Sequence, residues 1–123
     1  MVQCRQERGT KGEHMEEISA RAFAQRYRED QWRGVQLIDV RELHEWEAYH
    51  LPEADLIPLQ TLPQESGRLQ REEPVYLLCA HGVRSEYAAR YLKGMGFSKV
   101  INVEGGLSKV LVFLENPNYT EKR

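Results

Sequence analysis

The 123-residue sequence has little cysteine, no basic excess and no long apolar run. Its two cysteines, Cys4 and Cys79, are too few for a disulfide scaffold and too far apart in sequence for a zinc motif. The net charge is −2, whereas nucleic-acid-binding proteins usually carry a basic excess, so we expect no nucleic-acid partner. No apolar stretch approaches the roughly 18 residues that a membrane span needs, so we expect no membrane association.

The amino-terminal stretch, residues 1–14, is polar and lacks the apolar segment of a secretory signal. Its early acidic residues also argue against a transit peptide, so we expect a cytoplasmic protein in a reducing compartment. The length indicates one domain with a modest core, which we place at residues 15–115. We expect a flexible tail at 1–14 and a polar tail at 116–123.

Short β-rich runs alternate with segments of helical periodicity along this domain. Buried strands are predicted at 35–40, 73–79 and 99–103, and an edge strand at 54–59, where Pro58 limits pairing. Helices are predicted at 18–30 with Ser19 as N-cap, at 41–52, at 85–96 and at 105–114. This alternation predicts the α/β class: a small parallel sheet with helices on both faces.

In parallel sheets, functional sites gather at the carboxyl ends of strands. Asp39 with Arg41 follows one predicted strand, and Cys79 with the loop CAHGVRS follows another. A strand-to-helix turn directs backbone N–H groups inward, and the helix dipole adds partial positive charge. Both features favour the thiolate form that a nucleophilic cysteine needs.

The other residues of this loop suit the same chemistry. Gly82 permits a positive φ or a close approach of a ligand to the backbone. Arg84 adds a permanent cation with a planar donor fork that suits an oxyanion. Ser85 stands at the expected helix start, where its hydroxyl can cap the helix or donate toward the sulfur.

Five short motifs occur in an order that resembles one known family. They are Asp-Val-Arg, an acidic-aromatic pair, His-Leu-Pro, Cys-x-x-Gly-x-Arg-Ser and Glu-Gly-Gly, all between residues 35 and 106. Together they resemble the single-domain rhodaneses, which are sulfurtransferases. The resemblance implies the rhodanese-like three-layer fold. One departure concerns the last helix, where the family commonly has a tryptophan near the position of Val110, so the choice of acceptor is less defined.

The resemblance implies a double displacement through Cys79, without metal or organic cofactor. The Cys79 thiolate takes the sulfane sulfur of a donor such as thiosulfate, and a thiophilic acceptor then removes it. The expected partners are small sulfur donors and thiol acceptors, with a protein sulfur donor or a thioredoxin-like reductant as further candidates. The residues expected to bind substrate are those of the loop: Ala80, His81, Gly82, Val83, Arg84 and Ser85.

Two other functions compete with this interpretation. A persulfide carrier or protein-interaction module with little small-molecule turnover would keep the same cysteine. Phosphatases and arsenate reductases of similar fold use Cys-x5-Arg, whereas Cys79 and Arg84 are separated by four residues. The shorter ring suits one added sulfur better than a phosphoryl group with three oxygens.

Supporting roles are expected for three further residues. Asp39 is expected to accept hydrogen bonds from loop amides, and Arg41 to pair with an acid such as Glu45. Glu104 precedes two glycines that let the last helix pack closely, and we hypothesise that it forms a salt bridge with Arg84. His81 is expected at the pocket rim and Cys4 as a passive exposed thiol; the sequence leaves open whether either takes part.

Overall fold

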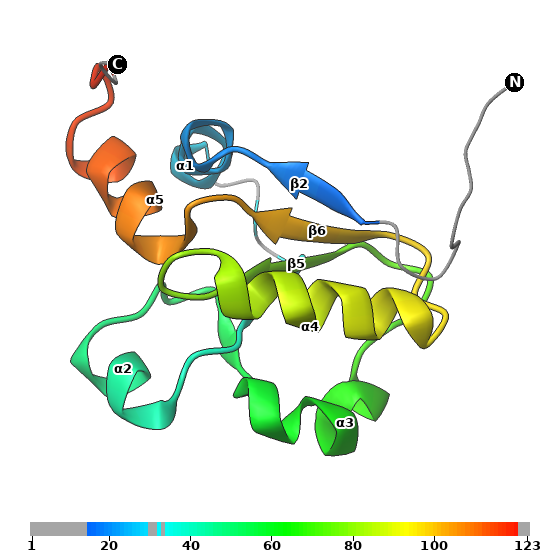
Figure 1. Cartoon of the computed structure of the whole chain (residues 1–123). Helices are drawn as coiled ribbons and strands as arrows, with labels where there is room; N and C mark the ends of the chain where they lie inside the picture. Colours follow the sequence, from blue (N-terminus) through cyan, green and yellow to red (C-terminus); the bar gives the residue numbers. More distant parts are fainter. Residues whose placement is uncertain (1–14, 30–31, 33, 121–123) are drawn as a thin grey trace, which may run out of the picture.

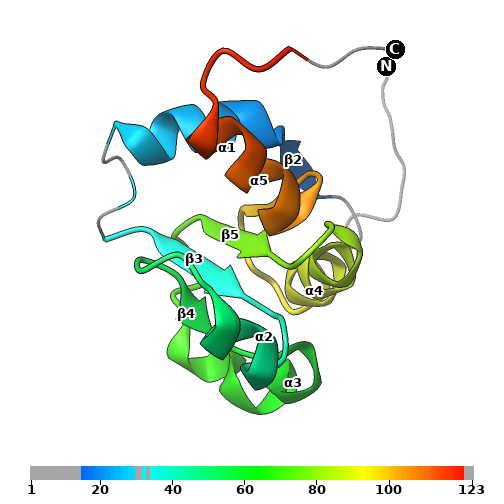
Figure 2. The same cartoon turned by 90° about the vertical axis from the view of Figure 1, so that its left-hand side faces the viewer.

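The computed structural model describes residues 15–29, 32 and 34–120. Within this part of the chain, five parallel strands form one sheet in the order β2-β6-β5-β3-β4. Figure 1 shows β2, β6 and β5 side by side, and Figure 2 shows β5, β3 and β4. The strands are Glu16–Ile18 (β2), Gln36–Asp39 (β3), Asp55–Leu56 (β4), Val75–Leu78 (β5) and Val100–Val103 (β6). β5 is therefore the central strand. The loop that begins with Cys79 follows its carboxyl end, in the middle of the sheet.

Helices cover both faces of the sheet, which confirms the predicted α/β class (Figure 2). α1 and α5 lie together on one face, and α4 lies on the other with the short turns around α3. The helices are Ala20–Arg28 (α1), Leu43–Ala48 (α2), Leu62–Glu65 (α3), Val83–Gly94 (α4) and Gly106–Glu115 (α5). Two 3₁₀ turns flank α3, at Leu59–Thr61 (η2) and Ser66–Arg68 (η3).

The central strand β5 is buried on both faces, because successive side chains of a strand point to opposite sides. Tyr76 and Leu78 pack into the cluster under α1 and α5. Val75 and Leu77 pack with the residues under α4. These two cores fix the position of the carboxyl end of β5, and with it the position of Cys79.

The amino-terminal part of the domain departs from the sequence prediction at one point. Ser19 is the N-cap of α1 as expected, and its hydroxyl accepts from the Ala22 amide at 3.0 Å. Ile18, however, belongs to strand β2 rather than to the helix, and it pairs in register with Val103. The sequence of β2 has no strand pattern of its own; its extended form comes from pairing with β6.

The second predicted helix is shorter than expected, and its apolar face is only partly buried. α2 covers six residues, and Trp46 packs against the core of α1 and α5 while Leu43 is 54% and Tyr49 48% exposed. Tyr87 on α4 was also expected to pack, yet it is 64% exposed. Helical spacing with Trp46 and with Tyr91 predicts that Tyr49 and Tyr87 pack against the core, and that prediction is wrong for both.

Residues 116–120 follow α5 and return to α1. The Tyr119 ring packs against Phe113 with centroids 5.7 Å apart, and its carbonyl accepts from Arg21 at 2.6 Å. The predicted tail at 1–14, with Cys4, lies outside the described residues, as do residues 121–123. None of the described helices is both long enough and apolar enough to cross a lipid bilayer.

Candidate active site

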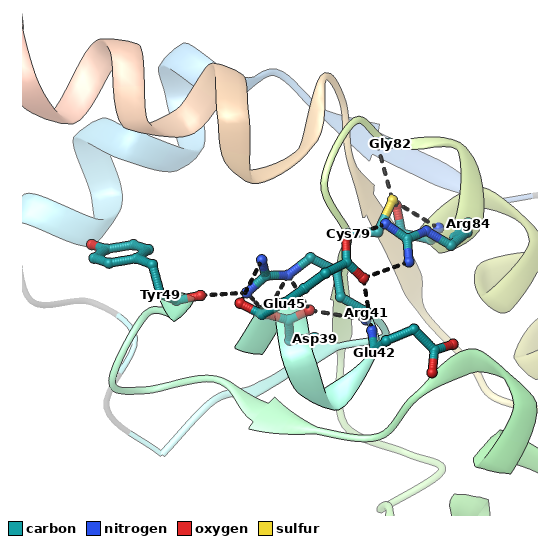
Figure 3. Close-up of polar contacts among 9 residues, drawn as sticks. Asp39, Arg41, Glu42, Glu45, Tyr49, Cys79, Gly82 and Arg84 are labelled. Atoms are coloured by element: carbon teal, nitrogen blue, oxygen red, sulfur yellow. Dashed lines mark hydrogen bonds and ion pairs between the residues drawn. The ribbon is translucent and has the colours of Figure 1, made fainter. Parts of the chain in front are cut away.

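The sulfur of Cys79 lies at the carboxyl end of β5, within the turn that leads to α4 (Figure 3). Two backbone amides donate to it: that of Gly82 at 3.1 Å and that of Ser85 at 3.3 Å. Cys79 is buried, with an exposed fraction of 1%. The turn thus surrounds the sulfur with inward-pointing N–H groups, although the side chain itself is closed off.

A left-handed glycine lets the chain turn around the sulfur. Gly82 is the N-cap of α4 and has a φ of +97°, a conformation that residues with a Cβ rarely adopt. A Cβ at this position would also lie 3.0 Å from the backbone nitrogen of Gly105. The expected role of Gly82 in a tight turn is therefore confirmed.

The amino terminus of α5 holds the outer side of the same loop. The Leu107 amide donates to the Cys79 carbonyl at 2.7 Å, and the Ser108 amide donates to the Ala80 carbonyl at 3.1 Å. A Cβ on Gly106 would lie 2.5 Å from the Ala80 backbone, so the two segments are in backbone contact. Because the loop carbonyls are bound on this outer side, the loop amides are free to face the sulfur. The expectation that the paired glycines permit close packing is confirmed.

A buried polar chain links the sulfur to strand β6. The thiol lies 3.3 Å from the Ser85 hydroxyl, which donates to Asn102 Oδ1 at 2.5 Å. Asn102 Nδ2 in turn donates to the Gly82 carbonyl at 3.3 Å. The sequence suggested that Ser85 caps the helix or donates to the sulfur, but it does neither. Its hydroxyl donates to Asn102 and accepts a hydrogen bond from the Cys79 thiol.

Arg84 projects from the loop to α2, where it meets a carboxylate (Figure 3). Its Nη1 and Nη2 atoms lie 2.8 and 2.9 Å from the two oxygens of Glu45. The hydrogen bonds from Arg84 hold the pKa of Glu45 at about 2, against an ordinary value of 4.5. The hypothesised pair between Glu104 and Arg84 is thus wrong: α2 places Glu45 against the guanidinium, while Glu104 is exposed.

Asp39 and Arg41 satisfy each other at the end of β3. The guanidinium contacts both oxygens of Asp39, with Nη2 at 2.8 Å, and the Arg41 amide donates to the same carboxylate at 3.0 Å. Arg41 Nη2 also donates to the Tyr49 carbonyl at 2.7 Å. Asp39 accepts a loop amide as expected, but Arg41 pairs with Asp39 rather than with the Glu45 side chain. Proximity in the chain decides this pairing.

The remaining loop residues line the surface around the sulfur. Ala80 is half-buried, whereas Val83 is 60% exposed at the first turn of α4. His81 is exposed, as expected for a rim position, and its Nδ1 lies 3.0 Å from the Ser108 hydroxyl. Beside them is an open cavity of about 360 Å³ between α2, the loop and α5. Its lining residues are Arg41, Glu45, Ala48, Tyr49, Ala80, His81, Leu107, Ser108 and Leu111.

Sequence reasoning missed two residues of this site. Asn102 was treated only as part of a strand, although a buried amide in the middle of an apolar run is itself a signal that a polar partner lies nearby. Glu45, the acid of the acidic-aromatic pair, is expected from the sequence to bind Arg41, because the sequence does not tell which of two arginines α2 approaches. Both residues hold the loop through side chains that come from distant elements.

This arrangement defines a class: a parallel α/β domain with one cysteine cradled by amides at a central strand end. The sequence model of the Rhodanese-like domain matches residues 19–111. The chain therefore belongs to the rhodanese family of sulfur-transfer proteins.

Individual relatives support the same family. "Putative sulfur carrier protein YrkF" of Bacillus subtilis is 41% identical over 91 residues, 74% of this chain and 48% of YrkF. The thiosulfate sulfurtransferase GlpE of Tolumonas auensis is 36% identical over 73 residues, 59% of this chain and 69% of GlpE. The chain thus spans about half the length of YrkF.

A solved structure resembles this fold closely. It is the rhodanese-like domain protein from Staphylococcus aureus, with a TM-score of 0.70 and 33% sequence identity. The alignment covers 78% of this chain and 91% of the other. The similarity thus extends over nearly all of a single-domain relative.

Proposed function

We propose that the protein transfers sulfane sulfur through a persulfide on Cys79. The Cys79 thiolate attacks the outer sulfur of the donor, forming a new S–S bond. The donor's own bond to that sulfur breaks, and its electron pair leaves with the donor remnant; for thiosulfate the remnant is sulfite. A thiol acceptor then attacks the outer sulfur and returns Cys79 to the thiolate. This is covalent catalysis in which the chain supplies the nucleophile.

The observation that carries the proposal is the convergence of the Gly82 and Ser85 amides on Cys79 Sγ. Hydrogen bonds to the charged form of a group favour that form. The same donors suit the thiolate before the reaction and the negative end of a persulfide after it. Ser85 can join them, because its hydroxyl can turn its proton from Asn102 toward a sulfur that no longer donates.

A carrier function is the second candidate, in which Cys79 is loaded once and delivers its sulfur to another protein. The similarity to YrkF favours it, because that relative is described as a sulfur carrier. The 1% exposure of Cys79 favours it as well, since a closed site suits a partner that opens it. The similarity to GlpE favours turnover of a small donor instead.

Intact mass spectrometry after incubation with thiosulfate or glutathione persulfide tests the shared chemistry. We expect the wild-type protein to gain one sulfur atom and the Cys79→Ser variant to gain none. A gain that persists in Cys79→Ser, or no gain from either donor, would contradict the proposal.

Kinetics then separate the two candidates. Multiple turnovers with a small acceptor such as cyanide or glutathione indicate an enzyme, whereas one sulfur loaded per chain without turnover indicates a carrier. An aryl phosphate serves as the negative control. Its hydrolysis by a protein that gains no sulfur would favour the phosphatase chemistry that the four-residue spacing argues against.

A further inference from the structure

The arginine that follows Cys79 in the loop is already bound to a carboxylate. Arg84 gives both ends of its donor fork to Glu45, at 2.8 and 2.9 Å. This contact is the largest cause of the raised pKa of Arg84, and the charge of Cys79 is a smaller cause in the same direction. A donor anion that approaches Arg84 therefore meets a guanidinium whose charge is already balanced by Glu45.

Glu45 is held in this position by its own helix. Its Oε1 also accepts from the Glu42 amide at the start of α2, at 2.9 Å. The Glu45 carboxylate is thus held by the Glu42 amide on one side and by Arg84 on the other. Bidentate contacts between arginine and a carboxylate are among the stronger side-chain interactions, because both hydrogen bonds are charge-assisted.

The second arginine beside the loop is also committed. Arg41 contacts both oxygens of the buried Asp39 and donates to the Tyr49 carbonyl. Among the described residues that line the cavity, this leaves His81 as the other group able to carry positive charge. A compact dianion such as thiosulfate therefore finds no uncommitted arginine in the described part of the site.

The cavity beside the loop suits a larger molecule with carbon atoms. Its volume is about 360 Å³, in the range of small-molecule sites. Apolar groups of Leu107 and Leu111 form one wall, and Tyr49 stands on the side of α2. Glu45 belongs to the same lining, so a molecule in the cavity lies against the contact between Glu45 and Arg84.

We propose that Glu45 determines donor specificity. By occupying Arg84 it disfavours small dianionic donors, while the adjoining cavity takes the organic part of a persulfide. This inference rests on the proposed function and names its substrate class. The Cys79 thiolate attacks the outer sulfur of an organic persulfide whose S–S–H group is protonated, the S–S electron pair leaves with the inner sulfur as a thiolate, and the outer sulfur with its proton stays on Cys79. That proton is then lost to water.

The contact can be tested without any sulfur donor, by alkylating Cys79 with anionic iodoacetate and neutral iodoacetamide. Glu45→Gln keeps an oxygen for the Glu42 amide but removes the charge. We expect it to raise the iodoacetate-to-iodoacetamide rate ratio about tenfold, equivalent to about 1.4 kcal/mol. Glu47→Gln is the matched control, an exposed glutamate on the same helix, and should leave the ratio within about twofold. An unchanged ratio in Glu45→Gln would overturn the inference.

Donor kinetics test the substrate class itself. We expect wild-type kcat/KM to be higher for glutathione persulfide than for thiosulfate. Glu45→Gln should raise the thiosulfate value about tenfold, chiefly through KM, and change the persulfide value less than threefold. A purely structural role for Glu45 would instead lower both values together.

The outcomes separate the two proposals. A wild-type preference for thiosulfate, or equal effects on both donors, overturns the donor specificity and leaves sulfur transfer through Cys79 intact. A wild-type protein that loads sulfur from neither donor overturns the proposed function and the donor preference with it. The alkylation ratio reports on the contact between Arg84 and Glu45 in either case.

Discussion

Two neighbouring strands end in buried groups that can carry negative charge, and the chain satisfies them in different ways. β3 and β5 pair in parallel, with Asp39 opposite Leu78, so Asp39 and Cys79 stand at the same edge of the sheet. Asp39 is fully buried and receives a guanidinium from Arg41. Cys79 is equally closed, yet its donors are the amides of its own loop.

The difference separates a charge held by a side-chain cation from a sulfur held by backbone amides, to which we assign the proposed chemistry. Arg41 and Asp39 form a buried ion pair, and removing either one leaves the other buried and unpaired. Backbone amides carry no net charge, so they tolerate a thiol, a thiolate or a sulfur chain one atom longer. The comparison predicts that changes at β3 act mainly on stability, and that changes at β5 act mainly on chemistry.

Removing the cation at the end of β3 should have the largest effect on stability. Arg41→Met leaves the Asp39 carboxylate buried without its partner, which we expect to cost about 3–5 kcal/mol in unfolding free energy. Urea denaturation measures this. The double variant with Asp39→Asn should be less destabilised than the sum of the single variants, and additivity would show that the two residues do not act as a pair.

Disturbing the contact between α5 and the loop should follow in size. Gly106→Ala places a Cβ within 2.5 Å of the Ala80 backbone at a φ of +68°, so we expect overpacking and strain to cost about 3 kcal/mol. Sulfur loading should fall with it, because the amides around the sulfur lose their support. Gly67→Ala, at a position with open space, is the control and should change stability by less than about 0.5 kcal/mol.

The β5 end should respond in the opposite way. Cys79→Ser keeps an acceptor for the Gly82 and Ser85 amides, so we expect a loss of only about 1 kcal/mol in unfolding free energy together with complete loss of sulfur loading. Urea denaturation and intact mass measure the two effects on the same sample. A stability loss as large as that of Arg41→Met would show that the thiol is a structural group, and the contrast between the strand ends would fail.

The smallest effect concerns pH. The pKa of Glu45 is lowered to about 2 in the folded protein from 4.5, so its contribution is complete above about pH 5 and is lost as the pH falls toward 2. Because the pair is partly exposed, we expect Glu45→Gln to cost about 1 kcal/mol at neutral pH. The difference in unfolding free energy between wild type and variant should shrink as urea titrations move from pH 6 to pH 3. A difference that does not vary with pH would rule out the charge as its cause.

Local pattern was sufficient to predict most of the sheet and the identity of the loop. Strands β3, β5 and β6 are short apolar runs, and burial of such runs is favourable. The sequence CAHGVRS lies between a buried strand and an amphipathic helix. The strand β2 could not be predicted, because its residues Glu16–Ile18 become extended only by pairing with β6. Pairing of this kind depends on the whole fold.

The charge pairs of the site show the same limit. The sequence identified Arg41, Arg84 and Glu45 as charged residues near strand ends, and it assigned Glu45 to Arg41. In the structure, Arg41 pairs with Asp39, two residues away in the sequence, and Glu45 pairs with Arg84, 39 residues away. The second pairing depends on where α2 lies relative to α4, and no local signal encodes that distance.

The backbone contact between α5 and the Cys79 loop also orders events during synthesis. The loop carbonyls are bound by the amides of Leu107 and Ser108, which are translated more than twenty residues after Cys79. While Leu107 and Ser108 are still inside the ribosome, β3 can pair with β5. The hydrogen bonds that hold the turn around the Cys79 thiol cannot yet form. The turn around the thiol is therefore completed late in synthesis, together with the part of the hydrophobic core that Leu107, Val110 and Phe113 of α5 supply.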